Sequence, residues 1–314
     1  MGQKSVICLG CAFWDTIFKV DRIPGHGTKL LPERAVQAAS GMATAAAVTV
    51  ARLGAPVELW ARVGDDSTAD AFLRQISREG VETRWVRRVP GAATAFSTIL
   101  VDPAGERLVV PYTDPSLDDD PAWLPLDRVA RAGAVLVDVR WVEGAEVLLR
   151  EARRQGVPAI LDADIAPADI LRRLLVLADH VLFSEPALMS IASGSDHRAA
   201  IRDIASHCDA RIIGVTLGER GAVVFDRREP ETLKSIAAPS VRALDTLNAG
   251  DVWHGTYAYG LVSGWPLERT IALSNLAAAM KCEHFGGRLG SPTLAQLLER
   301  SRVETAGGER DPVP

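Results

Sequence analysis

The sequence is short of lysine and of aromatic residues, and it has no long apolar run. Its 35 basic residues are mostly arginines scattered along the chain, and the formal charge is −5 with a pI near 5.7. A nucleic-acid partner would require a basic cluster, which this pattern does not supply. Without a membrane-length apolar stretch or the apolar core of a signal peptide, we predict no membrane partner and a cytoplasmic protein.

Several familiar catalytic motifs are also missing. The sequence has no P-loop, no three-glycine dinucleotide fingerprint, no G-x-S-x-G elbow and no H-E-x-x-H. Cys8 and Cys11 form a C-x-x-C pair, but no second pair completes a zinc site, so we expect inert core thiols. The chemistry must therefore come from another pattern.

The sequence does contain a regular alternation of short apolar runs and helical segments. Strands apolar on both faces and separated by helices indicate a parallel sheet with right-handed crossovers. Ser67 is the expected N-cap of the second helix. The predicted fold is an α/β, doubly wound, mostly parallel sheet flanked by helices. The expected strands are residues 5–10, 57–63, 134–138, 159–162, 181–183 and 212–216, and the first two helices are 43–53 and 67–79.

Two segments interrupt this alternation and are typical of hairpins. Residues 13–38 carry a Pro-Gly turn between two strand-like runs, and residues 94–112 turn near Gly105. Together they would form a small antiparallel β lid over the carboxyl ends of the core strands, where such folds bind ligands. We expect one domain over residues 1–304 with both lid segments inserted, followed by a flexible tail over 305–314.

Residues 245–251, Asp-Thr-Leu-Asn-Ala-Gly-Asp, form the most informative stretch. They precede an apolar run that predicts a helix. Small residues let the amides of a helix N-terminus face an anion, which the helix dipole also favours. A carboxylate there can take the proton of a hydroxyl while the amides hold a transferring phosphoryl group. The structural alternative is an aspartate that caps a helix after a glycine-containing turn.

This stretch resembles the C-terminal signature of the ribokinase-like (PfkB) carbohydrate kinases. Ser40-Gly41 with residues 52–54 downstream, residues 63–66, residues 79–81 and the two hairpins match the same family. The resemblance covers nearly the whole chain. It implies a ribokinase-like fold, ATP and Mg²⁺ as cofactors, and a sugar hydroxyl as the phosphoryl acceptor. In many members K⁺ is a further cofactor.

The resemblance implies a catalytic centre at the start of the predicted helix. Asp251 would be the general base, and the backbone amides of Ala249, Gly250 and Asp251 would form the anion hole. Asn248 stands where many members have glycine, but Asn tolerates unusual backbone angles, so the turn should survive. Asp245 would help to hold a monovalent cation beside the anion hole.

The same resemblance implies residues for the two substrates. Asp15 would bind sugar hydroxyls, and Gly41 would let the backbone approach the sugar. On the nucleotide side it implies Thr216, Gly218, Gly221 and Asn275.

The magnesium motif of the family is incomplete. Its N-x-x-E pattern is Ser184-Glu185-Pro186-Ala187 here, so the second carboxylate is absent. Ser184 remains as a residue of the nucleotide side. Mg²⁺ would be held mainly by phosphate and water, or by Glu185.

A narrower resemblance links the chain to bacterial sulfofructose kinases, through residues 137–141, 161–165, 183–186 and 281–288. That branch implies that Lys29 and Arg140 bind the C6 sulfonate of the sugar, and charge-assisted hydrogen bonds favour such an anion. Pro111 stands where the branch has a lid asparagine, and proline has no side-chain donor.

We therefore predict an ATP-dependent sugar kinase that phosphorylates a primary hydroxyl of a ketose, with C1 of 6-deoxy-6-sulfofructose as the favoured acceptor. Two alternatives stay open: a kinase for fructose, fructose 6-phosphate or a ribose-like sugar, and a regulator that binds sugar or nucleotide without catalysis. The expected partners are the sugar and ATP. Lids of this family often pair, so a homodimer through the lid is also expected.

Overall fold

The structure, a computed structural model, describes residues 3–117 and 120–308. Within these residues the centre is a sheet of nine strands in the order β13-β12-β11-β10-β9-β8-β1-β4-β5. All neighbours from β11 to β5 pair in parallel, whereas β12 and β13 are antiparallel at one edge. The strands are β1 (Ser5–Gly10), β4 (Val57–Gly64), β5 (Val86–Val89), β8 (Ala132–Val137), β9 (Ala159–Ala163), β10 (His180–Ser184), β11 (Ile212–Thr216), β12 (Ala222–Asp226) and β13 (Leu233–Ile236).

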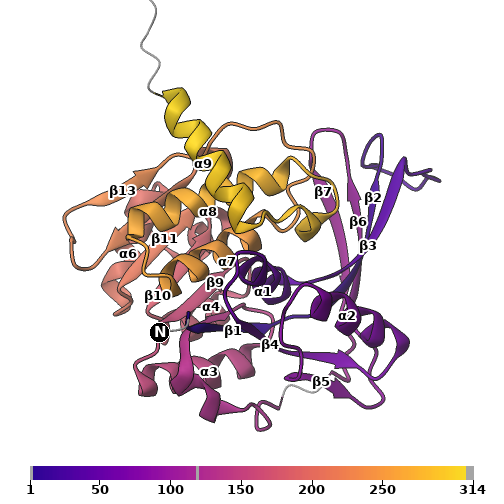
Figure 1. Cartoon of the computed structure of the whole chain (residues 1–314), viewed down its shortest axis with the longest axis horizontal. Helices are drawn as coiled ribbons and strands as arrows, with labels where there is room; N and C mark the ends of the chain where they lie inside the picture. Colours follow the sequence, from indigo (N-terminus) through magenta and orange to yellow (C-terminus); the bar gives the residue numbers. More distant parts are fainter. Residues whose placement is uncertain (1–2, 118–119, 309–314) are drawn as a thin grey trace, which may run out of the picture.

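Helices cover both faces of this sheet (Figure 1). Each face of the sheet packs against its own hydrophobic core. In β1, Val6 and Cys8 belong to one core, and Ile7 and Leu9 belong to the other. A strand that is apolar on both faces is what a sheet covered on both sides requires. One layer holds α1 (Met42–Arg52), α2 (Ser67–Arg78), α7 (Ala249–Val262), α8 (Leu267–Cys282) and α9 (Leu294–Gly308); the other holds α3 (Val142–Gln155), α4 (Ala168–Leu175), α5 (Glu185–Ile191) and α6 (His197–His207).

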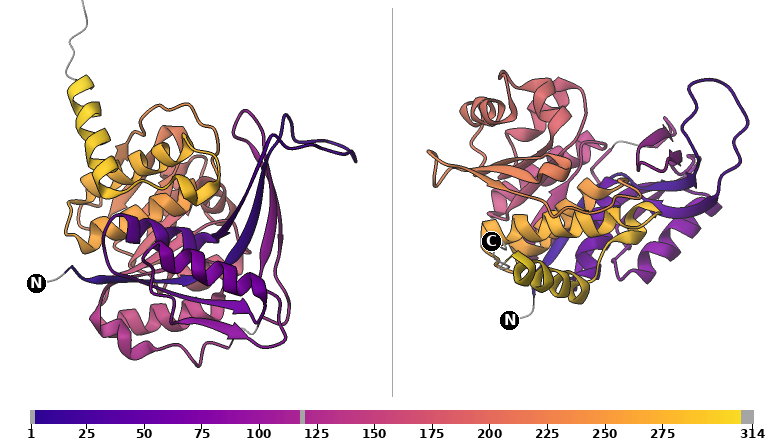
Figure 2. Two further views of the ribbon diagram at one scale, coloured as in Figure 1. Left: turned by 45° about the vertical axis from the view of Figure 1, so that its right-hand side comes forward. Right: turned by 90° about the horizontal axis from the view of Figure 1, so that it is seen from above.

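A second, smaller sheet stands beside the core and forms the lid (Figure 2). Its order is β3-β2-β6-β7, with β2 (Phe13–Lys19), β3 (Arg34–Ser40), β6 (Phe96–Val101) and β7 (Arg107–Tyr112). Each hairpin is antiparallel, and the two hairpins join through a parallel pairing of β2 with β6. Since β1 ends at Gly10 and β2 begins at Phe13, the lid is tied to the carboxyl edge of the core.

The predicted α/β fold is confirmed, and the predicted strands lie within a few residues of the observed ones. The predicted N-cap at Ser67 is wrong. Asp66 caps α2, and its carboxylate accepts a hydrogen bond from the Ala69 amide. Aspartate is favoured at this position because its negative charge also interacts favourably with the helix dipole.

The C-terminal part also differs from the expectation. Helix α9 continues to Gly308, past the predicted boundary at residue 304, and residues 309–314 of the expected tail lie outside the described residues. In the part of the chain that the structure describes, no helix is both long and apolar enough to cross a membrane.

Candidate active site

The site begins at the N-terminus of α7, where the chain turns at Asn248. This residue adopts a left-handed conformation with φ of 60°, the only non-glycine residue among those described to have a positive φ. Its side chain donates to Asp251 Oδ2 at 2.6 Å and accepts from the Arg288 amide at 3.1 Å. The expectation that Asn would preserve the turn is thus confirmed. The amides of the first helical turn have no acceptor within the helix, so Gly250 and Asp251 can offer theirs to an anion.

Asp251 is buried in the first turn of α7, with 9% of its surface exposed. Burial raises its pKa to about 6, because the charged form loses solvation, and the Asn248 hydrogen bond opposes that shift. The nearby carboxylates of Asp164 and Asp138 raise it further. A carboxylate with a pKa near neutrality is suited to accept a proton in a reaction at cellular pH.

Asp138, just after β8, holds three loops of the site together. Its carboxylate is fully buried and accepts from the amides of Cys11 at 2.8 Å, Ala43 at 3.1 Å and Arg140 at 2.8 Å. These amides belong to the segment after β1, the start of α1 and the loop after β8. The sequence offered no local motif for this role, since the donors are far apart in the chain.

A second buried acid, Asp162, is the last but one residue of β9 and lies next to His254. Its Oδ2 has no hydrogen-bond partner within the described residues and lies 3.3 Å from His254 Nδ1. Burial raises the pKa of Asp162 and lowers that of His254, so the low-dielectric surroundings favour the neutral form of each group. His254 Nδ1 also lies 2.8 Å from the Gly250 carbonyl, one turn earlier in α7.

Asp245 organises the loop that leads into α7. It is fully buried, and its carboxylate accepts from the amides of Leu247, Gly286 and Gly287, each at 2.8 Å. Its backbone carbonyl accepts from the ammonium of Lys281 at 2.5 Å. Lys281 was not among the predicted site residues, because a lysine near the end of an apolar helix gives no sign of where its ammonium lies.

The predicted sugar residues Asp15 and Gly41 lie at the roots of the lid. Asp15 is 5% exposed and accepts from the Ser97 hydroxyl at 2.6 Å; burial raises its pKa. Gly41 has φ of 108°, and a Cβ there would lie 2.5 Å from the Cys11 carbonyl. A side chain at position 41 would therefore be both strained and obstructed.

The two predicted anion-binding residues lie in different parts of the molecule. Lys29 is exposed in the loop between β2 and β3 of the lid. Arg140 follows β8 in the core, donates to the Ile165 carbonyl at 2.8 Å and pairs with Asp164 at 3.1 Å. The lid must therefore bring Lys29 toward Arg140 if both are to hold one substrate.

The predicted nucleotide residues follow β10 and β11, with one on α8. Thr216 ends β11, and Gly218 and Gly221 adopt φ of 60° and 85° in the turn beyond it. Ser184 ends β10 and donates to Asp164 Oδ1 at 2.9 Å. Asn275 is buried, and its amide donates to the Ile236 and Ala237 carbonyls while its oxygen accepts from Trp253. These bonds make Asn275 a support for the loop after β13.

Glu185, the remaining acid of the incomplete magnesium motif, pairs with Arg220 at 2.5 Å. Among residues 3–117 and 120–308, no group of three His, Cys, Asp or Glu side chains is arranged to hold a metal ion. Mg²⁺ commonly keeps several waters and binds through one or two carboxylates plus substrate phosphates. The residues present are compatible with such a site: the nucleotide would carry the ion, and Glu185 or Asp164 would supply a carboxylate, directly or through water.

One lid residue at the site was missed by the sequence analysis. Arg107, at the start of β7, donates to the Thr246 hydroxyl at 2.7 Å, and that hydroxyl donates to the Gly105 carbonyl at 2.9 Å. The β6–β7 turn is therefore docked on the loop that precedes the anion hole. The hairpin itself was predictable, but the loop that its tip contacts was not.

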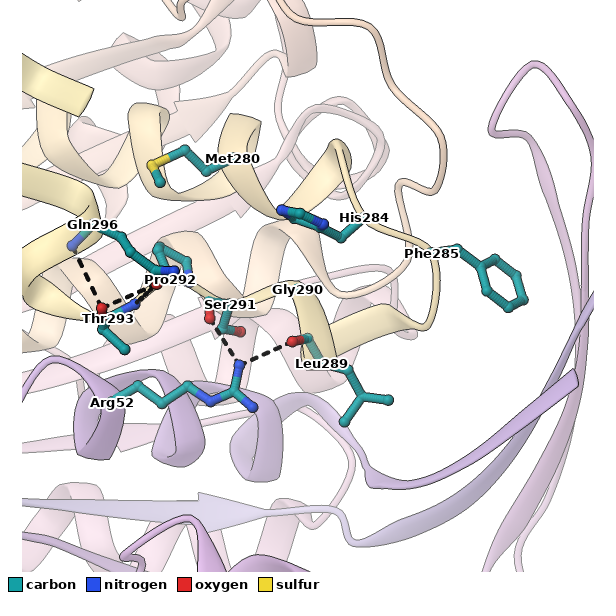
Figure 3. A pocket seen from close by; sticks show the side chains of 10 residues that line it. All are labelled: Arg52, Met280, His284, Phe285, Leu289, Gly290, Ser291, Pro292, Thr293 and Gln296. Carbon is teal, nitrogen blue, oxygen red and sulfur yellow. Dashed lines mark hydrogen bonds between the residues drawn. The ribbon is translucent and has the colours of Figure 1, made fainter. Parts of the chain in front are cut away.

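A separate pocket between α1, α8 and α9 is lined by Arg52, His284 and neighbouring residues (Figure 3). Arg52 donates there to the carbonyls of Leu289 and Ser291, and it also pairs with Glu79. These bonds of Arg52 fix the loop after α8 to α1.

A buried carboxylate beside free helix amides, at the carboxyl edge of a parallel sheet and under a lid, defines an enzyme that transfers a phosphoryl group to an alcohol. Comparison with known proteins agrees. The family model described as pfkB family carbohydrate kinase matches residues 3–294, so the chain belongs to the pfkB family of carbohydrate kinases.

Individual relatives cover nearly the whole chain. A ribokinase from Haemophilus influenzae is 25% identical over 305 residues, which is 95% of this chain and 98% of the relative. A crystal structure from Agrobacterium tumefaciens is 40% identical with a TM-score of 0.93, covering 99% of this chain and 100% of the other. An Arabidopsis thaliana ribokinase solved with ribose and ATP is 21% identical, with a TM-score of 0.80 and coverage of 95% and 98%.

The family membership makes the chain an ATP-dependent carbohydrate kinase. It decides against a regulator without catalysis.

Proposed function

We propose that the chain transfers the γ-phosphoryl group of ATP to a primary hydroxyl of a ketose, with C1 of 6-deoxy-6-sulfofructose as the acceptor. The observation that carries the reaction type is the position of Asp251, a buried carboxylate in the same helical turn as the anion-hole amides. The acceptor hydroxyl would lie between the carboxylate and the phosphoryl group.

In the proposed mechanism Asp251 takes the hydroxyl proton as the oxygen attacks the γ-phosphorus. The bond from that phosphorus to the β–γ bridging oxygen breaks, and ADP leaves with its electron pair. The amides of Gly250 and Asp251 stabilise the charge on the phosphoryl oxygens. The Ala249 amide, which was expected to join them, donates to the Thr246 carbonyl at 3.3 Å and holds the turn before α7. Asp15 and the backbone at Gly41 orient the sugar, and the turn at Gly218 and Gly221 receives the nucleotide phosphates. Mg²⁺, when bound, neutralises phosphate charge. Closure of the lid excludes water, which limits wasteful hydrolysis of ATP.

Two cations support an anionic acceptor. Arg140 follows β8 at the carboxyl edge of the core, where its amide donates to Asp138 at 2.8 Å. Lys29 is exposed in the loop between β2 and β3 of the lid. A sulfonate has three acceptor oxygens, which a paired Lys and Arg can bind with charge-assisted hydrogen bonds. A phosphate on C6 offers the same chemistry.

A neutral sugar such as ribose or fructose is the second candidate. The Arg140–Asp164 ion pair favours it, because this pair already compensates the charge of the arginine. Pro111 also offers no side-chain donor on the lid, and the relatives reported above include ribokinases.

ADP release from ATP measured with ribose, fructose, fructose 6-phosphate and 6-deoxy-6-sulfofructose separates these candidates. The proposal requires kcat/KM for the sulfonated sugar to exceed that for fructose by about a hundredfold, the value of two charge-assisted hydrogen bonds. Equal or better turnover of ribose or fructose would overturn the sulfonate proposal and leave the kinase assignment intact.

We also propose that the lid pairs with the lid of a second copy. β7 is an edge strand whose six residues are all exposed, and Val109, Val110 and Tyr112 present 42%, 57% and 47% of their surfaces. An exposed apolar edge strand is a template for pairing. Sedimentation should give a dimer that Val110→Asp dissociates; a monomeric wild-type protein at about 100 µM would contradict the pairing.

A further inference from the structure

Lys281 is completely buried directly behind the anion-hole loop. It lies in the last turn of α8, with none of its surface exposed. Its Nζ is 2.5 Å from the Asp245 carbonyl oxygen and 3.4 Å from Asp245 Oδ1. Lysine is almost never fully buried unless it is paired, since removing its charge from water is costly. A specific role must offset that cost.

The partner of Lys281 is the residue that organises the site. Besides the ammonium, the Asp245 carboxylate accepts from the amides of Leu247, Gly286 and Gly287. The first amide belongs to the loop that enters α7. The other two precede Arg288, whose own amide donates to Asn248. One buried carboxylate thus joins the loop that enters α7 to the loop that follows α8, and its charge is balanced by Lys281.

A monovalent cation was expected at Asp245, and the residues present do not fit one. Such an ion would be coordinated by oxygen atoms, and Asp245 offers its carbonyl and Oδ1. Both lie within hydrogen-bonding or ion-pairing distance of the Lys281 ammonium. An added ion at these oxygens would stand against a like charge in a low-dielectric interior, where repulsion is strong.

We propose that the Lys281 ammonium is a built-in replacement for the monovalent cation, which holds the Asp245–Asn248 loop in place so that the kinase needs no added K⁺. Lys281 is a positioning residue here: it acts through Asp245 on the amides of Gly250 and Asp251. The proposal depends on those amides forming the anion hole, as set out under the proposed function.

The wild-type protein gives the first test. ATP turnover with an accepted sugar is measured at constant ionic strength in KCl, NaCl and tetramethylammonium chloride. We expect kcat to agree within about twofold in all three salts, because only general screening remains. The Tm should likewise agree between KCl and tetramethylammonium chloride. Activation by K⁺ of about tenfold or more, or a rise in Tm specific to K⁺, would overturn the proposal.

Two substitutions give the second test. Lys281→Met removes the charge and keeps the volume, whereas Lys281→Ala also opens space for an ion. Both should lower kcat about a hundredfold, the effect of a small displacement of catalytic groups. K⁺, NH₄⁺ or methylammonium should restore activity to Lys281→Ala and not to Lys281→Met, and KCl should raise the Tm of Lys281→Ala alone. Lys4→Met, an exposed lysine before β1, is the control.

Retention of wild-type kcat by Lys281→Met would overturn the proposal. If neither variant folds, the wild-type salt series still decides. The Tm comparison does not require the correct sugar, so an error in the proposed acceptor leaves it unaffected. An error in the assignment of Asp251 as the base would appear separately, as full activity of Asp251→Asn, in which the backbone amides remain.

Discussion

The anion-hole loop of the core and strand β7 of the lid meet through the Arg107–Thr246 hydrogen bond, yet their surroundings differ sharply. In the loop, Asp245 is fully buried, and each of its carboxylate oxygens accepts a hydrogen bond. Its partner Lys281, in the last turn of α8, is also fully buried. In β7, every residue is exposed and one strand edge lacks a neighbour in the sheet order. The first region is held in one geometry, and the second can move against it.

This difference separates two tasks of a kinase. The amides and carboxylate that act on the phosphoryl group must stay within a fraction of an ångström of the productive geometry. The groups that enclose the sugar must open for substrate and close for the reaction. Substitutions in the core loop, and of Arg107 where the lid contacts that loop, should therefore act mainly on kcat. Other substitutions in the lid should act mainly on KM or on the choice of sugar.

Asp251→Asn should produce the largest effect. An amide cannot take the hydroxyl proton, and loss of a general base lowers kcat by about 10²–10⁴. ATP affinity, measured by calorimetry, should change by less than about threefold because the backbone amides remain. Asp209→Asn, at an exposed aspartate, is the control. A variant that keeps more than about a tenth of wild-type kcat would remove Asp251 as the base.

Arg107→Gln tests one contact between the lid and the core loop, the hydrogen bond to the Thr246 hydroxyl. We expect kcat to fall about tenfold, because the docked turn loses a charged hydrogen bond. Burial raises the pKa of Asp251 and the charge of Arg107 opposes that shift, so the substitution should also move the acid limb of the kcat–pH profile to higher pH. Arg34→Gln, a lid arginine that lies over the Phe285 ring, is the control and should leave the profile in place. If the kcat–pH profile of Arg107→Gln does not move, the charge of Arg107 does not affect the pKa of the base Asp251.

Asp138→Asn asks whether the loops of the core site depend on one buried carboxylate. The amide would present donors to backbone amides that now donate to oxygen, so the free energy of unfolding should fall by about 1–3 kcal/mol. Urea unfolding measures this, with Asp127→Asn, an exposed aspartate, expected to be neutral. Unchanged stability would show that the Asp138 carboxylate does not hold the three loops together.

Lys29→Ala and Arg140→Ala should give the smallest effects and only on the sugar side. Each should raise KM for an anionic sugar about tenfold, the value of one charge-assisted hydrogen bond, with kcat nearly unchanged. KM for fructose should not change. Equal losses on both sugars would exclude a pocket for the anion.

The sequence predicted the alternating elements and the turn at Asn248 well, because both depend on local chemistry: apolar periodicity in the first case and tolerance of positive φ in the second. The roles of Asp138, Lys281 and Arg107 could not be predicted in this way. Their partners lie 127, 36 and 139 residues away in the chain, so only the assembled fold brings them together.

The cap of α2 was missed for a smaller reason. Asp66 and Ser67 are both good capping residues, and sequence alone did not decide which of two neighbours begins the helix.

The pH dependence of kcat under single-turnover conditions, where product release cannot mask the chemical step, tests the central claim that Asp251 accepts the hydroxyl proton. Because a protonated carboxyl cannot act as a base and burial raises the pKa of Asp251 to about 6, kcat should fall about tenfold per pH unit below that value. The same acid limb should be absent from the residual activity of Asp251→Asn. A wild-type rate that stays constant from about pH 5 to about pH 8 would contradict the claim.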